Sequence, residues 1–229
     1  MHGGIGRIVA GKPLDPALLE ENVEAVRAGA GNLAKQIENV LLFGVPAVVA
    51  INSFPTDTPG EVEAIKEVAM AAGASAAVVA THFTDGGSGA ADLAEAVWAA
   101  ASSGSQFKLL YPDDAPLGEK ILTIATKVYG ADGIELLPAA KKALKLYEDL
   151  GFGHLPVCMA KTQYSLSDDA NLKGRPSGFT VTIRDIRLSA GAGFITPLLG
   201  EMRTMPGLPS RPGGEKIDID ADGNIVGLF

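Results

Sequence analysis

The sequence predicts an α/β fold of two small domains, each built on a mainly parallel sheet flanked by helices. Residues 46–51 and 76–80 are short apolar runs, and each is followed by a polar loop and then by a helical pattern. Continuous apolar runs are typical of strands that helices cover on both faces, as in a parallel sheet. The serine- and glycine-rich stretch 102–105 is the best linker candidate, so we predict one domain over 1–105 and a second over 106–229.

The first predicted domain alternates helices and strands. Apolar residues recur at helical spacing over 15–42, although Gly29 and Gly31 leave open whether this is one unbroken helix. The stretch from Thr56 to Thr58 can cap the helix that follows the first strand. The elements after residue 42 are then a strand over 46–51, a helix over 58–73 that stops at Gly73, a strand over 76–80 and a helix over 90–103.

The second predicted domain mixes helices with strands of different exposure. Pro138 suits the first turn of a helix, whereas Pro197 cannot donate to a strand ladder and favours an edge strand. The predicted elements are helices over 117–129 and 138–150, a buried strand over 156–161, a half-exposed strand over 179–184, an edge strand over 194–199 and a terminal hairpin over 217–226.

Two side chains are predicted to lie in the core. Trp98 shares a helix face with Leu93 and Val97, and Cys158 is a small residue inside an apolar run. His82 fits a turn or the surface, since no carboxylate partner lies at an obvious spacing.

Composition excludes several classes of partner. The 229 residues carry a formal net charge of -8, which argues against nucleic acid. No basic amphipathic run and no apolar run of about 20 residues is present, so we expect no membrane partner. Three scattered histidines and one cysteine offer no metal-site spacing. A lone cysteine and the lack of a visible signal peptide fit a cytoplasmic protein.

Two stretches imitate ligand-binding loops. Residues 6–12 match the start of a phosphate-binding P-loop, but Pro13 stands where a Ser or Thr should bind magnesium, and it lacks the N–H of a phosphate cradle. Residues 218–223 imitate a calcium loop, but the twelfth position would be Phe229 rather than a bidentate Glu. We therefore predict neither site.

Phe54 follows the first predicted strand and is a candidate ligand-binding residue. Because Pro55 cannot continue a strand ladder, the ring is left on the loop at the strand's carboxyl end, where open α/β sheets bind ligands. The alternative is a hydrophobic plug, and this stretch alone favours it because buried phenylalanine is common.

The loop 81–89, after the second predicted strand, is the other half of the candidate site. It carries Phe83 and a glycine-rich stretch that includes Gly86 and Gly87. Glycines let backbone approach a ligand closely, and a helix N-terminus favours anionic groups. A tight turn explains the glycines equally well.

Several stretches together resemble one family, formate–tetrahydrofolate ligase (10-formyltetrahydrofolate synthetase). Residues 159–165 are particularly specific, and the resemblance extends over almost the whole chain to residue 229. The other matching stretches are 1–4, 32–40, 43–58, 129–133, 151–169, 189–194, 204–209 and 227–229.

This resemblance implies an ATP-dependent ligase that joins formate to tetrahydrofolate and gives 10-formyltetrahydrofolate. In the family, ATP phosphorylates formate, and the formyl group passes to a folate nitrogen. ATP and magnesium belong to a large nucleotide-binding domain, which is expected to hold the catalytic residues and to end just before Met1. Residues 1–105 then resemble the middle domain, with the folate-side loops, and residues 106–229 the C-terminal domain.

The family also implies how a folate would be held. Its pterin lies between two aromatic rings, one of which corresponds to Phe54. The other is a tryptophan in the family, where this sequence has Phe83, and Asp85 stands where a Lys or Glu is usual. The implied folate-binding set is completed by Pro55, Gly86 and Gly87.

Two functional hypotheses follow. The chain is the folate-binding C-terminal portion of the ligase, inactive alone, or it is a non-catalytic folate-binding or structural partner protein. In either case we expect a small-molecule folate as ligand, and a homo-oligomer or association with a nucleotide-binding domain. Lys161 and Gln163 follow a strand end, where they could contact substrate or lie at the surface.

Overall fold

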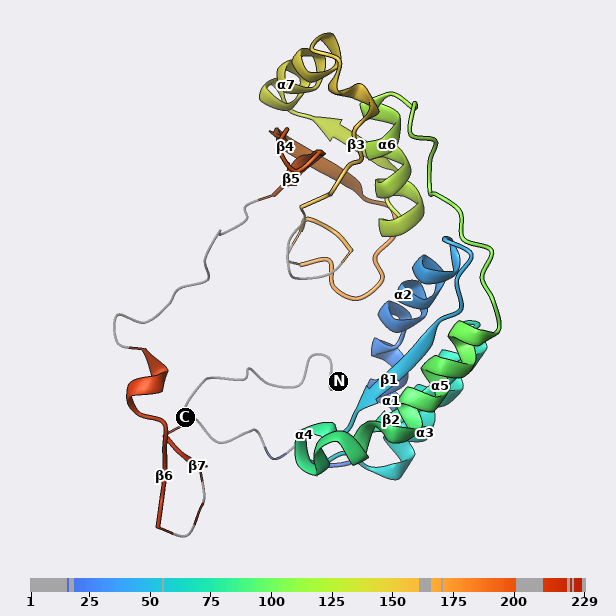
Figure 1. The fold of residues 1–229 in the computed structure, drawn as a ribbon, viewed down its shortest axis with the longest axis vertical. Coiled ribbons are helices and arrows are strands. Elements are labelled where there is room, and N and C mark those ends of the chain that lie inside the picture. The colour runs from blue at the N-terminus through green and yellow to red at the C-terminus, as the bar shows by residue number, and fades with distance from the viewer. Residues whose placement is uncertain are drawn as a thin grey trace. The chain divides into compact units, whose positions relative to one another are not determined.

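The computed structural model describes residues 16, 19–54, 56–160, 166–169, 171–200, 212–221, 223 and 225–227. Residues 21–202 belong to one compact unit, and a second unit contains the carboxyl-terminal segment. The α/β class is confirmed, with parallel strand pairs in two separate sheets (Figure 1). Within the described part of the chain, no helix has the length and apolar character needed to cross a membrane.

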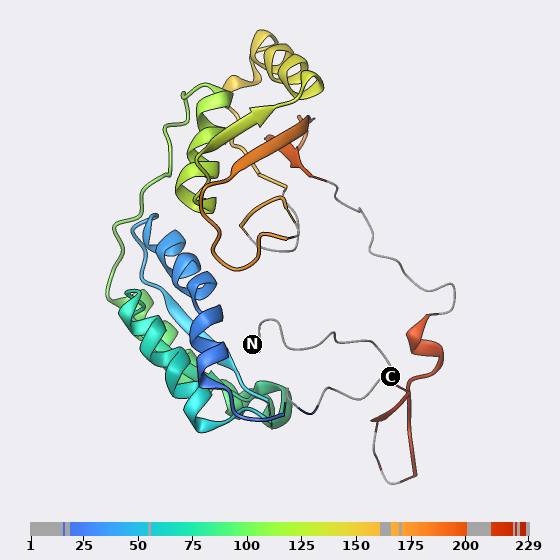
Figure 2. The same ribbon diagram turned by 180° about the vertical axis from the view of Figure 1, so that it is seen from behind.

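The first sheet consists of β1 and β2, which are parallel and in register from Val48↔Ala76 to Asn52↔Ala80. Helices α3 and α5 each contact both strands, and the ribbons place β1 between α1 and α2 on one side and α5 on the other (Figures 1 and 2). The elements are α1 (Val23–Gly29), α2 (Gly31–Leu41), β1 (Val48–Asn52), α3 (Pro59–Ala71), β2 (Ala76–Ala80), α4 (His82–Asp85), the 3-10 helix η2 (Gly86–Ala90) and α5 (Ala91–Ser102).

Local sequence explains the boundaries in this region. The predicted helix over 15–42 is two helices, which meet at Ala30 between the glycines at 29 and 31. The side chain of Asn22 caps α1 by accepting a hydrogen bond from the N–H of Ala25 at 2.9 Å. Gly73, at φ 95°, ends the turn after α3, where a residue with a Cβ would be strained.

The second sheet has the order β3-β4-β5, with β3 parallel to β4 and β4 antiparallel to β5. Its strand β3 is a four-residue element that the sequence did not predict. The elements are α6 (Leu117–Thr123), the π-helical stretch η3 (Ile124–Tyr129), β3 (Gly133–Leu136), α7 (Pro138–Asp149), the 3-10 helix η4 (Phe152–His154), β4 (Thr180–Ser189) and β5 (Phe194–Leu199).

The edge-strand prediction for 194–199 is wrong, because β5 has partners on both sides. On the side away from β4, Val157 and Ala160 form parallel bridges to Ile195 and Leu198. The N–H of Ile195 donates to the carbonyl of Pro156, and that of Leu199 donates to the carbonyl of Ala160. Pro197 lies between these two residues and lacks an N–H, so one hydrogen bond of this ladder is missing and the pairing tolerates its loss. The segment 156–160 therefore forms the edge instead of β5.

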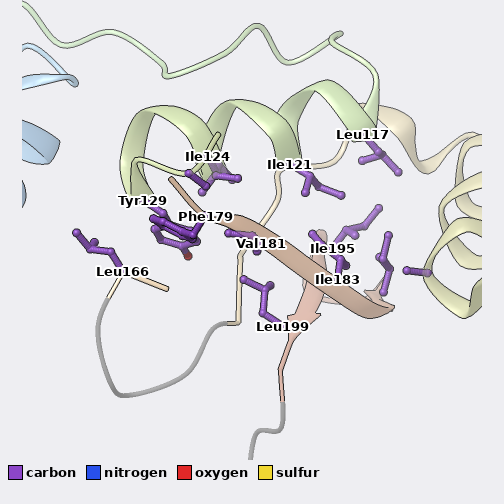
Figure 3. Packing of buried hydrophobic residues seen from close by; sticks show 14 residues of the cluster. Leu117, Ile121, Ile124, Tyr129, Leu166, Phe179, Val181, Ile183, Ile195 and Leu199 are labelled. Atoms are coloured by element: carbon purple, nitrogen blue, oxygen red, sulfur yellow. The ribbon is translucent and has the colours of Figure 1, made fainter. Parts of the chain in front are cut away.

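One hydrophobic core fills the space between α6, α7 and the second sheet. Figure 3 shows Leu117 and Ile121 of α6 and Ile124 of η3 above Val181 and Ile183 of β4. The β4 side chains alternate between buried and more exposed along most of the strand, as the period-two pattern predicted. The buried members are Leu117, Ile121, Ile124, Ala125, Tyr129, Ala131, Ala140, Leu166, Phe179, Val181, Ile183, Ile186, Ile195 and Leu199.

The predictions that Trp98 and Cys158 are core residues are wrong. Trp98 is 76% exposed, and α5 has no buried residue at all. Cys158 is exposed because side chains alternate along its extended segment: Val157 and Met159 pack against the core and Cys158 faces outward.

The terminal hairpin prediction is confirmed in the second unit. Strands β6 (Asp218–Ile219) and β7 (Ile225–Val226) pair antiparallel, and a 3-10 helix, η5 (Gly213–Glu215), precedes them. Gly223 lies in the connection at φ 84°, a conformation that favours glycine.

Candidate functional site

The candidate site lies where β1 and β2 end. Asn52 and Ala80, the last residues of the two strands, are paired, so the two loops begin side by side. Phe54 lies two residues beyond β1, and Phe83 lies three residues beyond β2. Adjacent parallel strands place their carboxyl-end loops together, which is the usual ligand-binding position in open α/β sheets.

Phe54 is held on a closed turn and is not a core plug. Its N–H donates to Oδ2 of Asp57 at 2.8 Å, and the N–H of Asp57 donates back to the Phe54 carbonyl at 2.9 Å. The residue is 56% exposed, which contradicts the plug interpretation. Pro55 lies outside the described residues.

A capping box fixes the helix that follows this turn. Thr58 accepts the N–H of Glu61 through its hydroxyl at 3.3 Å, and the Glu61 carboxylate accepts the N–H of Thr58 at 3.2 Å. The other oxygen of Glu61 accepts the N–H of Asn22 at 2.9 Å, which ties the start of α3 to the start of α1. The Phe54 turn is therefore joined directly to an anchored helix.

Phe83 lies on α4 and is 89% exposed. The hydroxyl of Thr81 donates to Oδ2 of Asp85 at 2.6 Å, and the hydroxyl of Ser88 donates to the Asp85 carbonyl at 2.7 Å. These bonds hold the one-turn helix closed and leave the phenyl ring facing solvent.

Different structural constraints explain why glycine occupies positions 86 and 89 of this loop. Gly86 has φ 62° and ψ -144°, a conformation open essentially to glycine alone. A Cβ on Gly89 would lie 2.6 Å from the Thr81 carbonyl carbon, since the N–H of Thr81 donates to Gly89 at 2.9 Å. A Cβ on Gly86 or Gly87 would meet nothing within 4 Å, so the space beside both is open. The turn thus accounts for Gly86 and Gly89, while Gly87 is left without a local structural reason.

A hollow of about 350 Å³ adjoins the Phe54 turn. Phe54 and Asp57 contribute to one end, and Phe83 is not among the lining residues. Most of the lining is apolar, as in small-molecule sites with a few polar groups. The hollow is lined by Val26, Ala30, Leu33, Val49, Ala50, Ile51, Asn52, Phe54, Asp57, Glu61, Val62 and Ile65.

Sequence comparison identifies the family of the chain. The family model described as formate–tetrahydrofolate ligase matches residues 1–229. The chain belongs to the formate–tetrahydrofolate ligase family. It is 56% identical over 227 residues to the formate–tetrahydrofolate ligase of Saccharopolyspora erythraea, with 99% of this chain and 40% of the relative covered. The ligases of Roseiflexus sp. (strain RS-1) and Desulforamulus reducens are 54% identical over 227 residues and 52% over 229, again covering 40% of each relative and 99% and 100% of this chain.

The chain therefore spans about 40% of the length of these ligases. Lys161 and Gln163, for which the sequence left a substrate contact open, lie outside the described residues. Within the described parts of the chain, no group of three or more His, Cys, Asp or Glu side chains is placed to hold a metal ion.

Lys120 is a buried polar residue that sequence reasoning missed. Its side chain is fully buried, and Nζ donates to the carbonyls of Asp113 at 2.5 Å, Gly153 at 3.0 Å and Leu155 at 3.2 Å. Burial lowers the pKa of the Lys120 amine, and the nearby carboxylate of Asp113 opposes that shift. The available signal was a lysine inside the apolar stripe of α6, next to Ile121.

Further bonds connect α2 to the second half of the same compact unit. Nζ of Lys35 donates to the Lys127 carbonyl at 2.7 Å. Arg175 makes a bidentate pair with Glu38, at 2.7 and 2.8 Å. Paired, planar donors of this kind fix geometry more than they add stability at an exposed site.

Proposed function

We propose that this chain is the folate-binding portion of a formate–tetrahydrofolate ligase. Tetrahydrofolate binds at the loops after β1 and β2, with its pterin against Phe54 and Phe83. The single observation that carries the proposal is the pair of exposed phenylalanines at the carboxyl ends of two paired parallel strands. Both rings follow the ends of adjacent parallel strands, where open α/β sheets bind ligands, and their flat faces suit a bicyclic heterocycle.

The loop backbone completes the proposed site. We assign Pro55 to the same folate-binding set, and the open space beside Gly86 and Gly87 lets a flat ligand come close to the main chain. Residues 1–105 carry this folate side, and residues 106–229 form the C-terminal domain.

The remaining chemistry belongs to the part of the family's length that this chain does not span. ATP and magnesium are bound there, formate is activated there, and the catalytic residues lie there. The role of this chain is to hold the acceptor nitrogen in place, in the cytoplasm, as part of a homo-oligomer or in association with the nucleotide-binding domain. Alone, it releases no ADP in response to formate and tetrahydrofolate.

Calorimetric titration with tetrahydrofolate tests the site. We expect weak binding to the native chain and a loss of roughly two- to thirteenfold in affinity for Phe54→Ala, which corresponds to about 0.5–1.5 kcal/mol of stacking. Phe83→Trp should bind more tightly, because the larger ring offers more stacking area.

Phe107→Ala is the matched control, since Phe107 is 62% exposed but follows neither β1 nor β2. Its affinity should equal that of the native chain. Equal affinity in all four proteins would place folate elsewhere. No measurable binding to any of them would favour the alternative of a structural partner protein.

A further inference from the structure

The two-stranded sheet has an open edge along β1. The N–H of Ser53 donates to the carbonyl of Ala80 at 3.2 Å, and the N–H of Ser75 donates to Ala47 at 2.7 Å. Alternate residues of a parallel strand direct N–H and C=O to the same neighbour, so the odd-numbered residues of β1 face β2. The N–H and C=O groups of Val48, Ala50 and Asn52 therefore point to the other side.

Nothing in the described part of the chain pairs with that side. The sheet contains β1 and β2 alone, and no hydrogen bond joins the outward backbone groups of β1 to another described residue. Ala50 and Asn52 are correspondingly exposed, whereas Ile51, between them, is buried. An unpaired edge of this length is a template for one more strand.

Two apolar hollows run along the same strand. One is the 350 Å³ hollow near Phe54, and the other measures about 800 Å³. Residues of β1 line both hollows and no residue of β2 lines either, so both hollows lie along the β1 side of the sheet. The larger one is lined by Leu33, Gln36, Ile37 and Val40 of α2, by residues 45–50, by Val97, Ala100 and Ala101 of α5, and by Gly104 and Ser105.

The adjoining helix face is also uncovered. Val97 of α5 is 49% exposed and Trp98 is 76% exposed, while the helix buries none of its residues. Single exposed apolar residues are ordinary. Here, however, the open edge of β1 adjoins an apolar hollow, and α5, which carries the exposed Trp98, lines the same hollow.

We propose that the open edge of β1 binds one further parallel strand, rich in Val, Ile or Leu, from the part of the family's polypeptide outside this sequence. The relatives provide ample chain, because this sequence covers 40% of their length. A strand of about five residues, roughly 16 Å long, matches β1. Its backbone pairs with Val48, Ala50 and Asn52, and its side chains enter the two hollows. A parallel strand fits best, since β1 already pairs in parallel with β2 and helices flank the strand on both sides.

Amide hydrogen exchange is measured on two proteins. One is this chain alone, and the other is a full-length chimera in which this chain replaces the matching 227 residues of the Saccharopolyspora erythraea ligase. We expect the amides of Ala50 and Asn52 to exchange rapidly in the chain alone and about a hundredfold or more slowly in the full-length protein. The amides of Val49 and Ile51, which face β2, should be protected in both and report an intact sheet. Slow exchange of Ala50 and Asn52 in the monomeric chain, or fast exchange in the full-length protein, would overturn the proposal.

A proline substitution tests the same edge independently. Ala50→Pro removes an outward N–H, so it should lower the Tm of the full-length protein by more than that of the chain alone, whereas Ala50→Val should affect both alike. Equal effects of Ala50→Pro on the two proteins would exclude strand addition. Dimerisation of the chain alone with Ala50 and Asn52 protected would assign the edge to a second copy instead.

Discussion

The two sheets of the compact unit are buried to different extents. Around β3-β4-β5, fourteen buried hydrophobic residues form one cluster, and eight of them have no exposed surface. Around β1-β2, the corresponding cluster contains four buried residues, Ile37, Ala47, Ala69 and Ala74, of which three are alanines. The second sheet thus has a core of its own, while the first has a core of small side chains.

This difference separates the stable part of the chain from the part that carries the candidate site. Burial of apolar surface is the main favourable term in folding, so the region with the larger cluster should dominate stability. The loops of Phe54 and Phe83 and the open edge of β1 belong to the other region. Ligand and partner sites commonly lie in the less stable part of a structure.

The largest loss of stability should come from truncating a side chain in the larger core, the one around β3-β4-β5. Ile183 of β4 has no exposed surface, so Ile183→Ala should cost about 2–5 kcal/mol of unfolding free energy through lost burial and a residual cavity. Trp98→Ala, on the exposed face of α5, should change that free energy by less than about 0.5 kcal/mol. Chemical denaturation followed by circular dichroism measures both. A cost for Trp98→Ala as large as that for Ile183→Ala would show that α5 is already covered.

Removing the buried amine of Lys120 should cause the next largest loss of stability. Lys120→Met leaves the carbonyls of Asp113, Gly153 and Leu155 without their shared donor, and we expect a cost of about 3 kcal/mol. Lys145→Met is the matched control, because Lys145 pairs with Asp149 at 3.0 Å on an exposed helix face and should cost about 0.5 kcal/mol or less. Similar melting curves for the two variants would mean that the carbonyls of the larger core find other donors.

Alkaline pH should destabilise the larger core selectively. Burial raises the pKa of Tyr129 from its usual 10.0 to about 12. Between these values the unfolded chain releases the phenolic proton while the folded chain retains it, so rising pH favours unfolding. This contribution amounts to about 2.7 kcal/mol at most, at 1.36 kcal/mol per pKa unit.

Tyr129→Phe removes that proton and isolates the effect. The unfolding free energy of the native chain should fall relative to that of Tyr129→Phe as pH rises from 10 towards 12. Differences that stay constant over this range would show that the Tyr129 phenol ionises equally easily in the folded and unfolded chains.

Much of the fold could be predicted where one local rule was sufficient. The strand 76–80 matches β2, because a short apolar run between glycine-rich turns has one compatible structure. A cap within residues 56–58 was predicted, and the structure places it at Thr58 with Glu61 as its capping-box partner. β3 was missed, because four residues after a glycine turn are too few to display a period.

Side-chain environments were harder to predict than elements. Trp98 lies on an apolar helix face, but the pattern cannot tell whether a covering element is present, and α5 is exposed. The burial of Lys120 depends on carbonyls from two distant turns, which only the fold brings together. At the candidate site, the sequence placed Phe54 at a strand end but left a core plug open, and its 56% exposure required the structure.

The contrast between the two sheets is tested most directly by native-state amide exchange of the intact chain. We expect the amides of Val181 and Ile183 in β4 to be the slowest and to report global unfolding, while those of Val49 and Ile51 in β1 exchange at least about tenfold faster through local opening. Tetrahydrofolate should slow the β1 amides and leave those of β4 unchanged. Equal exchange rates in β1 and β4, with or without tetrahydrofolate, would contradict the separation of a stable core from a less complete, ligand-binding region.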